Sequence, residues 1–125
     1  MEAKKIMGSP RFEEVVQRFW HLLRANGANL ENLTVTKTQY MDLIKRIYRV
    51  LLPVYREQEM NSEIEQEWIL DSAGHNELSL HLFTKMLFRI AHSWATHINV
   101  DEYYELLTKI YQRITIKKVI KAANS

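Results

Sequence analysis

The sequence contains no cysteine, and it has only three glycines and two prolines in 125 residues. The absence of cysteine excludes disulfides, thiolate zinc sites and thiol catalysis, and it fits a reducing cytoplasmic compartment. Scarce glycine and proline argue against an all-β fold, which needs many turns. Apolar runs stay short of the roughly 18 residues of a membrane span, and the N-terminal stretch lacks a signal-peptide core. We therefore expect neither a membrane protein nor a secreted one.

Signatures of common catalytic and nucleic-acid-binding sites are missing as well. Gly8, Gly27 and Gly74 stand alone, so the chain has no glycine-rich loop for a phosphate and no Gly-x-Ser-x-Gly turn for a nucleophile. The histidines form no His-Glu-x-x-His motif, and we interpret them as exposed or loop residues: His21, His75, His81, His92 and His97. A net charge of +2 is too small for a general polyanion binder. These absences predict a non-catalytic protein with no cofactor, no small-molecule substrate and no nucleic-acid partner.

The composition that remains is that of one helical domain. Hydrophobic residues make up 46% and charged residues 26% of the chain, which is enough for a substantial core. A chain of this length normally forms a single domain. We predict an all-α fold of about five helices. It would have a flexible arm at residues 1–8, one helical domain at residues 9–116 and a basic tail at residues 117–125.

One local pattern recurs three times and marks the start of a helix. It places an apolar residue before a Ser, Thr or Asn that caps the helix, and an aromatic residue four positions after the cap, as in a hydrophobic staple. The three copies are Val35-Thr36 before Tyr40, Leu78-Ser79 before Phe83 and Ile98-Asn99 before Tyr103. Apolar pairs follow each copy, so the chain is predicted to consist of repeated helix-loop-helix units.

The first two predicted helices have clear starts. Ser9 caps a helix whose first residue is Pro10 and whose apolar stripe continues to about residue 24. A capping box of Thr36 and Gln39 starts the second helix, whose apolar pattern runs to about residue 56. Pro53 lies inside that pattern and is expected either to kink the helix or to end it just before the proline.

Three more helices are predicted in the second half of the chain. Ser62 and Glu65 form a capping box for a short, acidic third helix that ends near Asp71. The fourth covers residues 80–95 and is apolar around most of its circumference, so we expect a central helix or one with a binding face. The fifth starts at Asn99 and ends either before the basic tail or within it.

The segment of residues 68–83 resembles an EF-hand helix-loop-helix. When Asp71 is counted as the first loop position, Leu78 falls at the eighth, where the loops of paired hands exchange a short β contact. Val35 is the analogous residue of the first unit. The resemblance covers about residues 12–95 and implies a paired EF-hand-like bundle of helix-loop-helix units, with the fifth helix added at its C-terminal end.

The expected calcium ligands are largely missing from these loops. A calcium loop needs oxygen donors at its first, third, fifth, ninth and twelfth positions, the last a bidentate Glu. Loop by loop, these positions hold Ala28, Leu30, Asn32, Thr36 and Gln39, then Asp71, Ala73, His75, Ser79 and Leu82, then Ala91, Ser93, Ala95, Asn99 and Glu102. We predict degenerate EF-hands that do not bind calcium. The alternative is a calcium-binding regulatory protein that exposes an apolar groove.

The second half of the chain is also similar to degenerate EF-hand-like modules of ciliary and flagellar proteins. The matching residues are Trp68, Asp71, Gly74, Phe83, Trp94, Ile98, Tyr103 and Leu107. An acidic residue expected before the second tryptophan is replaced by His92-Ser93. The resemblance implies a structural part of a cilium, a flagellum or another microtubule-associated assembly, with a cytoplasmic location.

A partner-binding face is predicted on the fourth and fifth helices. EF-hand-like pairs commonly hold an amphipathic helix in an apolar groove lined by adaptable methionines. We assign the groove and its rim to Phe83, Met86, Leu87, Phe88, Trp94, Tyr104 and Tyr111. The other interpretation of these side chains is that they form the core. The predicted partner is a protein, either an amphipathic helix or a cytoskeletal component.

Charge is distributed unevenly along the chain. The second helix has a basic face at Lys45, Arg46, Arg49 and Arg56, and the C-terminal region is basic at Arg113, Lys117, Lys118 and Lys121. Negative charge gathers just after the second helix, at Glu57, Glu59, Glu63, Glu65 and Glu67. One explanation is a set of surface salt bridges between the second and third helices. The other is that the basic faces meet an acidic partner such as a tubulin surface.

Overall fold

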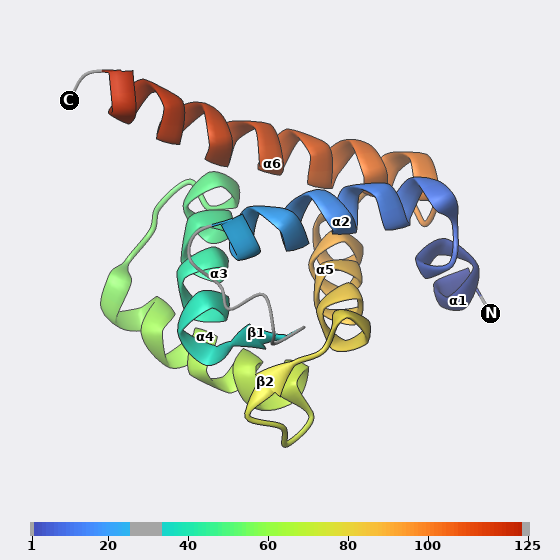
Figure 1. Ribbon diagram of the computed structural model, residues 1–125, viewed down its shortest axis with the longest axis horizontal. Coiled ribbons are helices and arrows are strands. Elements are labelled where there is room, and N and C mark those ends of the chain that lie inside the picture. Colours follow the sequence, from blue (N-terminus) through green and yellow to red (C-terminus); the bar gives the residue numbers. More distant parts are fainter. Residues whose placement is uncertain (1, 26–33, 124–125) are drawn as a thin grey trace.

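The computed structural model describes residues 2–25 and 34–123 and confirms the all-α fold (Figure 1). The described residues form six helices and one two-stranded sheet. In chain order the elements are α1 (Glu2–Met7), α2 (Pro10–Ala25), β1 (Val35–Thr36), α3 (Lys37–Leu51), α4 (Glu57–Ser72), β2 (Glu77–Leu78), α5 (Leu80–Trp94) and α6 (Val100–Ala123). Within this part of the chain, no helix combines the length and the apolar character needed to cross a membrane.

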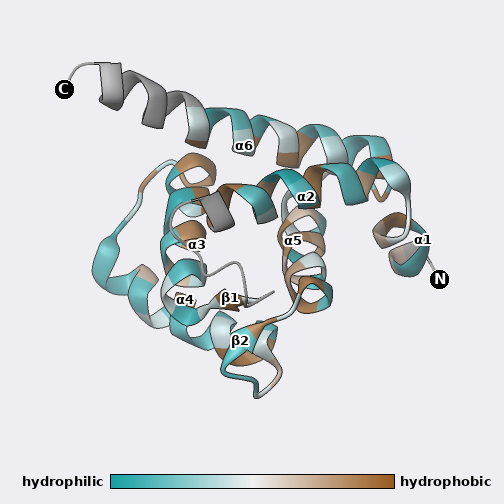
Figure 2. Cartoon of the chain, viewed as in Figure 1, coloured by the Kyte–Doolittle hydropathy of each residue, from teal (hydrophilic) through white to brown (hydrophobic). Residues whose placement is uncertain are grey.

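Helices α2 and α6 run side by side across the ends of α3 and α5, while α4 packs against α3 and α5 (Figure 1). The apolar stripes of α2, α3, α5 and α6 face one another, whereas α4 is mostly hydrophilic (Figure 2). Helical periodicity explains the stripes, because residues three and four apart share one face of a helix. The arrangement gives one hydrophobic core, with α4 on its outer side.

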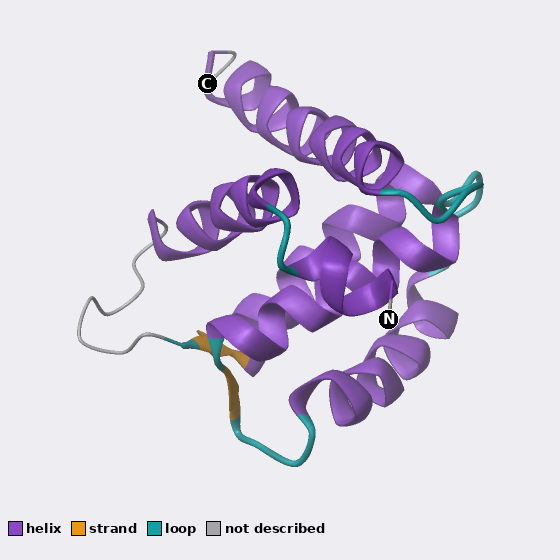
Figure 3. Ribbon diagram, turned by 90° about the vertical axis from the view of Figure 1, so that its right-hand side faces the viewer, coloured by secondary structure: helices purple, strands orange, loops and turns teal. Residues whose placement is uncertain are grey.

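The two helix-loop-helix units meet through their loops. Strands β1 and β2 pair antiparallel, with Val35 opposite Leu78 and Thr36 opposite Glu77 (Figure 3). Both Val35 and Leu78 are fully buried, so the apolar residue before each cap packs inward. The β contact predicted between these two residues is therefore confirmed.

The caps predicted at Thr36, Ser79 and Asn99 are present at the starts of α3, α5 and α6. Thr36 and Gln39 form the full capping box of α3. The Ser79 hydroxyl accepts from the Leu82 N–H at 3.2 Å, and the Asn99 side-chain oxygen accepts from the Glu102 N–H at 2.7 Å. These bonds satisfy backbone donors that a helix start leaves without an intrahelical partner.

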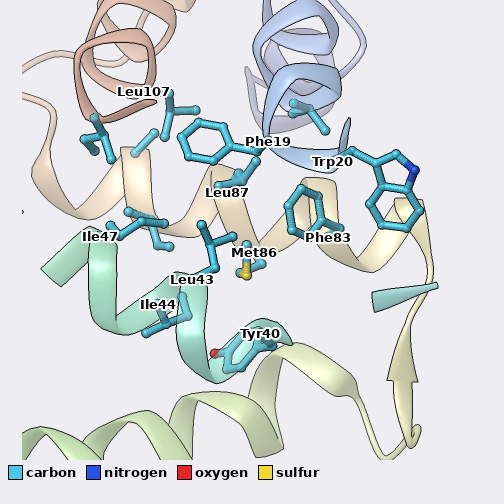
Figure 4. Close-up of a cluster of buried hydrophobic side chains, with 14 of the residues drawn as sticks. Phe19, Trp20, Tyr40, Leu43, Ile44, Ile47, Phe83, Met86, Leu87 and Leu107 are labelled. Atoms are coloured by element: carbon cyan, nitrogen blue, oxygen red, sulfur yellow. The ribbon is translucent and has the colours of Figure 1, made fainter. Parts of the chain in front are cut away.

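The core brings together large side chains from several helices, and Figure 4 labels those that come from α2, α3, α5 and α6. Trp20 of α2 lies edge-on to Phe83 of α5, with ring centroids 5.3 Å apart. Phe19 of α2 meets Tyr111 of α6 in a second edge contact at 5.4 Å. Edge-to-face pairs of this kind place the positive ring edge against the negative face of its neighbour. The aromatic contacts thus fix how α2 sits on both α5 and α6.

The flexible arm predicted at residues 1–8 is wrong for Glu2–Met7, because these residues form α1, which packs against α2 and α5. Ile6 of this helix is buried. Ser9 ties α1 to α2: its hydroxyl donates to the Ile6 carbonyl at 2.8 Å and accepts from the Phe12 N–H at 3.2 Å. The predicted cap at Ser9 is confirmed.

The start predicted for the third helix is also wrong. Helix α4 begins at Glu57, so the capping box assigned to Ser62 and Glu65 lies inside the helix. Arg56 stands at the cap position without a side-chain bond to the helix end. Glu57 and Glu59 in the first turn favour this earlier start, because carboxylates stabilise the positive end of the helix dipole.

Two helix ends settle alternatives that the sequence left open. Helix α3 ends at Leu51, two residues before Pro53, so the proline terminates the helix instead of kinking it. Helix α6 continues to Ala123, through the boundary predicted between residues 116 and 117. The predicted basic tail is thus helical backbone as far as residue 123, while the predicted first loop around Ala28, Leu30 and Asn32 lies outside the described residues.

Candidate functional site

The most distinctive polar site joins α3, α4 and α5 around Asp71. The Asp71 side chain is only 6% exposed, and it lies in the last turn of α4. Arg89 of α5 donates from Nε to Asp71 Oδ1 at 2.9 Å and from Nη2 to Asp71 Oδ2 at 2.8 Å. Tyr40 of α3 donates its hydroxyl to Asp71 Oδ2 at 2.7 Å. Both carboxylate oxygens are therefore engaged by side chains of neighbouring helices.

Glu67 extends this site by one helical turn. Arg89 Nη1 lies 2.8 Å from Glu67 Oε1, and the Tyr48 hydroxyl donates to the same carboxylate. Asp71 and Glu67 are four residues apart on α4, so both face the single guanidinium of Arg89. We name Tyr40, Tyr48, Glu67, Asp71 and Arg89 the polar lock, because these side chains fasten α4 to α3 and α5.

Burial and the two carboxylates shift the ionisation of this site. Burial raises the pKa of Tyr40 far above the usual tyrosine value, and the negative charge of Asp71 raises it further. Burial and the hydrogen bond to Glu67 likewise raise the pKa of Tyr48. Burial alone would lower the pKa of Arg89, but its bonds to Asp71 and Glu67 raise it above its usual range. The tyrosines are thus held neutral and the arginine charged.

Asp71 is the strongest calcium ligand that the sequence offers, and its carboxylate is already bonded within the polar lock. Asp71 stands at the first position of the predicted loop, but its oxygens point to Arg89 and Tyr40. The loop itself makes a tight turn after α4: Ala73 and Gly74 adopt positive φ of 51° and 84°. The His75 ring nitrogen lies 3.0 Å from the Ser72 carbonyl oxygen, which places it on the turn.

The remaining oxygen donors of the predicted loops serve helix ends. Thr36, Ser79 and Asn99 cap α3, α5 and α6, as described above. The Glu102 carboxylate accepts from the Thr96 N–H at 2.6 Å and from the His97 N–H at 3.1 Å. These backbone bonds lower the pKa of Glu102 despite some desolvation. Among the described residues, no group of three or more His, Cys, Asp or Glu side chains is placed to hold a metal ion.

The residues predicted to bind a partner fall into two groups. Phe83, Met86 and Leu87 are fully buried in the core, where a partner cannot reach them in this conformation (Figure 4). Their apolar neighbours on α2 and α3 occupy the face that the sequence assigned to a groove. The periodicity of α5 does not distinguish a core face from a groove, because both require the same apolar stripe.

The other predicted partner-binding residues lie nearer the surface. Trp94 is 41% exposed at the end of α5. Phe88 is half-buried and stacks on the His92 ring, with centroids 5.7 Å apart. Tyr104 is half-buried beneath the Arg11 guanidinium, and Tyr111 is half-buried against Phe19. The structure thus leaves Trp94 as the most accessible member of the predicted set.

The predicted interpretation of the histidines as exposed residues is confirmed for His21, His75, His81, His92 and His97. His92 nonetheless has a specific neighbour, since its Nδ1 lies 2.6 Å from the Tyr103 hydroxyl. One surface salt bridge joins α3 to α4, between Lys37 and Glu65 at 2.9 Å, but Lys37 is not one of the basic residues predicted to form such bridges. Of the predicted basic face, Arg46 pairs with Asp42 within α3 at 3.2 Å, and Arg49 lies over the Tyr55 ring.

Sequence reasoning missed Arg89, the centre of the polar lock. One signal was available, because Arg89 interrupts an apolar stretch that contains Met86, Leu87, Phe88, Ile90 and Ala91. A charge in such a stretch calls for a buried partner of opposite sign.

Comparison of the chain with protein-family models, with curated proteins and with solved structures finds no match.

Proposed function

We propose that this protein is a non-catalytic protein-interaction or structural module whose helix-loop-helix units work without calcium. The observation that carries the proposal is the engagement of both Asp71 oxygens by Arg89 and Tyr40. A cation at Asp71 would have to displace a bidentate guanidinium that already supplies positive charge. The loop offers few further oxygen ligands to repay that loss.

A docking role is supported by large apolar side chains that remain exposed on the described surface. They are Val54, Ile69, Leu70, Leu80, Trp94 and Ile98. Single exposed apolar residues are common, but Trp94 and Ile98 flank one short turn, and Ile69 and Leu70 are neighbours on α4. Tryptophan is enriched among the residues that contribute most of the binding energy in protein interfaces.

A ciliary, flagellar or other microtubule-associated partner is the part of the proposal that rests on sequence resemblance. Residues Trp68, Asp71 and Gly74 of the α4 end, together with Trp94, match the pattern of ciliary EF-hand-like modules. In the fold, Trp68 and Asp71 lie near the end of α4, Gly74 lies in the turn that follows it, and Trp94 is the last residue of α5. A module of this kind would work in the cytoplasm as a fixed spacer or adaptor for a cytoskeletal component.

The proposal is tested by a proton–nitrogen NMR spectrum of the whole chain recorded in chelator and then in millimolar calcium, with magnesium as the control cation. We expect dispersed peaks that calcium leaves in place. Saturable, calcium-specific shifts confined to residues 71–82 would overturn the calcium-independent function. The competing function, a calcium-regulated switch, would then lead, and Asp71→Asn would have to abolish the shifts.

A further inference from the structure

Helix α4 has an unusual charge pattern. Its sixteen residues include Glu57, Glu59, Glu63, Glu65, Glu67 and Asp71 but no lysine or arginine. Only Ile64, Trp68 and Ser72 of this helix are buried. The carboxylates exposed on the helix surface are those of Glu57, Glu59, Glu63 and Glu65, although the whole chain carries a net charge of +2. Such a separation of charge favours contact with a basic partner.

A groove runs between this helix and the end of α3. It has a volume of about 440 Å³ and is lined by Tyr48, Leu52, Glu59, Met60, Glu63 and Glu67. We name these residues the acidic groove. Tyr48, Leu52 and Met60 supply a buried or half-buried apolar floor. The glutamates are four residues apart, so they form a row with steps of roughly 6 Å along one face of α4.

The charges in the acidic groove are only partly neutralised. Glu67 belongs to the polar lock and is paired with Arg89. Glu59 has one loose partner, Arg56, at 3.6 Å, and both side chains of that pair are 71% exposed. Glu63 is exposed, and no ion pair within the described residues reaches it. The outer part of the groove thus presents two carboxylates beside apolar surface.

We propose that the acidic groove docks a basic amphipathic helix from a partner protein. Lysines or arginines spaced one turn apart on such a helix match the row formed by Glu59 and Glu63. Its leucines or isoleucines would cover Leu52 and Met60, whose burial adds the apolar contribution. This inference rests on the proposed function, and it names the partner chemistry and the surface that receives it.

The experiment titrates the whole chain with a synthetic helical peptide that carries lysines one turn apart beside a stripe of leucines. Binding is measured by calorimetry in the presence of chelator, and its location by NMR. A peptide with glutamate in place of every lysine is the control. We expect saturable binding of the lysine peptide alone, with the largest shifts at residues 48–52 and 59–67.

Matched variants of α4 distinguish the groove from general attraction to an acidic helix. Glu59→Gln with Glu63→Gln removes two groove charges, whereas Glu57→Gln with Glu65→Gln removes two exposed charges of the same helix that do not line the groove. We expect the groove pair to weaken binding about fivefold or more, and the other pair to have a much smaller effect.

Several outcomes would overturn the docking site. One is an equal loss in both variant pairs, and another is a set of shifts centred on Trp94 and Ile98 instead of the groove. A third is self-association of the chain that occupies the groove and excludes the peptide, measured by sedimentation. Because chelator is present throughout, none of these results depends on calcium, so failure of this inference leaves the NMR calcium test to decide the proposed function separately.

Discussion

Helices α4 and α5 are consecutive and similar in length, with 16 and 15 residues, yet they are held in the fold by different forces. Helix α5 buries Phe83, Met86, Leu87, Ile90 and Ala91 in the core. Helix α4 buries only Ile64, Trp68 and Ser72, and the polar lock joins it to its neighbours. Burial of apolar surface is non-directional, whereas hydrogen-bonded charges fix an orientation.

The difference has an energetic meaning. Burying an apolar helix face stabilises the fold in proportion to the area removed from water. A buried ion pair contributes less net stability, because its desolvation offsets much of its attraction, but losing one partner leaves an unpaired charge. We infer that α5 contributes more to the stability of the fold than α4 does, and that the polar lock sets the position of α4.

The largest effect is expected from a core substitution in α5. Leu87→Ala should destabilise the protein by about 3 kcal/mol, because it removes buried methyl groups and leaves a cavity. Leu70→Ala, the same change on α4 at a side chain 73% exposed, is the matched control and should cost little. Urea unfolding followed by circular dichroism measures both. Similar losses of unfolding free energy in the two variants would contradict the conclusion that apolar burial stabilises α5 more than α4.

A smaller effect is expected when the polar lock is opened at its centre. Arg89→Met should destabilise the protein by about 2 kcal/mol, since it leaves the Asp71 carboxylate buried with Tyr40 as its remaining side-chain donor; the partial exposure of Arg89 reduces the loss. Urea unfolding measures the change. The substitution should shift mainly the NMR peaks of α4 and of the residues that contact it. The peaks of residues at the contact between α2 and α6 should stay in place.

Two further variants sharpen the interpretation of Arg89. Adding Asp71→Asn to Arg89→Met should restore part of the lost stability, because the second change removes the unpaired charge. Arg18→Met breaks an exposed pair with Glu14 on α2 and should change the free energy of unfolding by no more than about 0.5 kcal/mol. If the double variant were less stable than Arg89→Met alone, the buried charge would not be the cause.

The smallest effect expected within the polar lock comes from the loss of a single hydroxyl. Tyr40→Phe removes the hydrogen bond to Asp71 and should cost about 1 kcal/mol. Tyr55→Phe is the matched control. The Tyr55 hydroxyl is buried and has no hydrogen-bond partner in the described structure, so removing it should leave the free energy of unfolding unchanged or raise it. Thermal unfolding of the two variants tests the contrast, which equal losses would contradict.

Tyr40 also predicts how stability depends on pH. Its folded-state pKa is raised, so the folded chain holds this proton more tightly than the unfolded chain does. The resulting stability is complete below pH of about 10, the usual tyrosine pKa, and is lost progressively as the pH rises further. Tyr40→Phe should make this alkaline decline shallower in urea unfolding, and an unchanged slope would show that Tyr40 does not cause it.

Much of the local structure could be predicted from sequence because its causes lie within a few residues. The caps Thr36, Ser79 and Asn99 bond backbone groups three positions away, so their pattern is readable in the chain. The start of α4 could not be read in the same way, since Ser62 and Glu65 match a capping box although the helix begins at Glu57. Local signals compete there, and the packing of the complete helix decides between them.

The candidate site was predicted only in part for a related reason. Asp71 stood out as the strongest ligand of its loop, but its partner Arg89 is 18 residues away along the chain. Whether a carboxylate faces a loop or a neighbouring helix depends on how two helices cross, which no local pattern specifies. The same reason explains why Phe83, Met86 and Leu87 matched a groove in sequence and lie in the core.

The sequence by itself determined the all-α fold, the helix caps and the β contact between Val35 and Leu78. Helical periodicity and capping act over one or two turns, so these features follow from short stretches of chain. Tertiary structure alone decided that α1 joins the core, that Arg89 engages Asp71 and that α4 presents an acidic groove. Each of these depends on side chains from different helices meeting in space, which only the packed chain brings together.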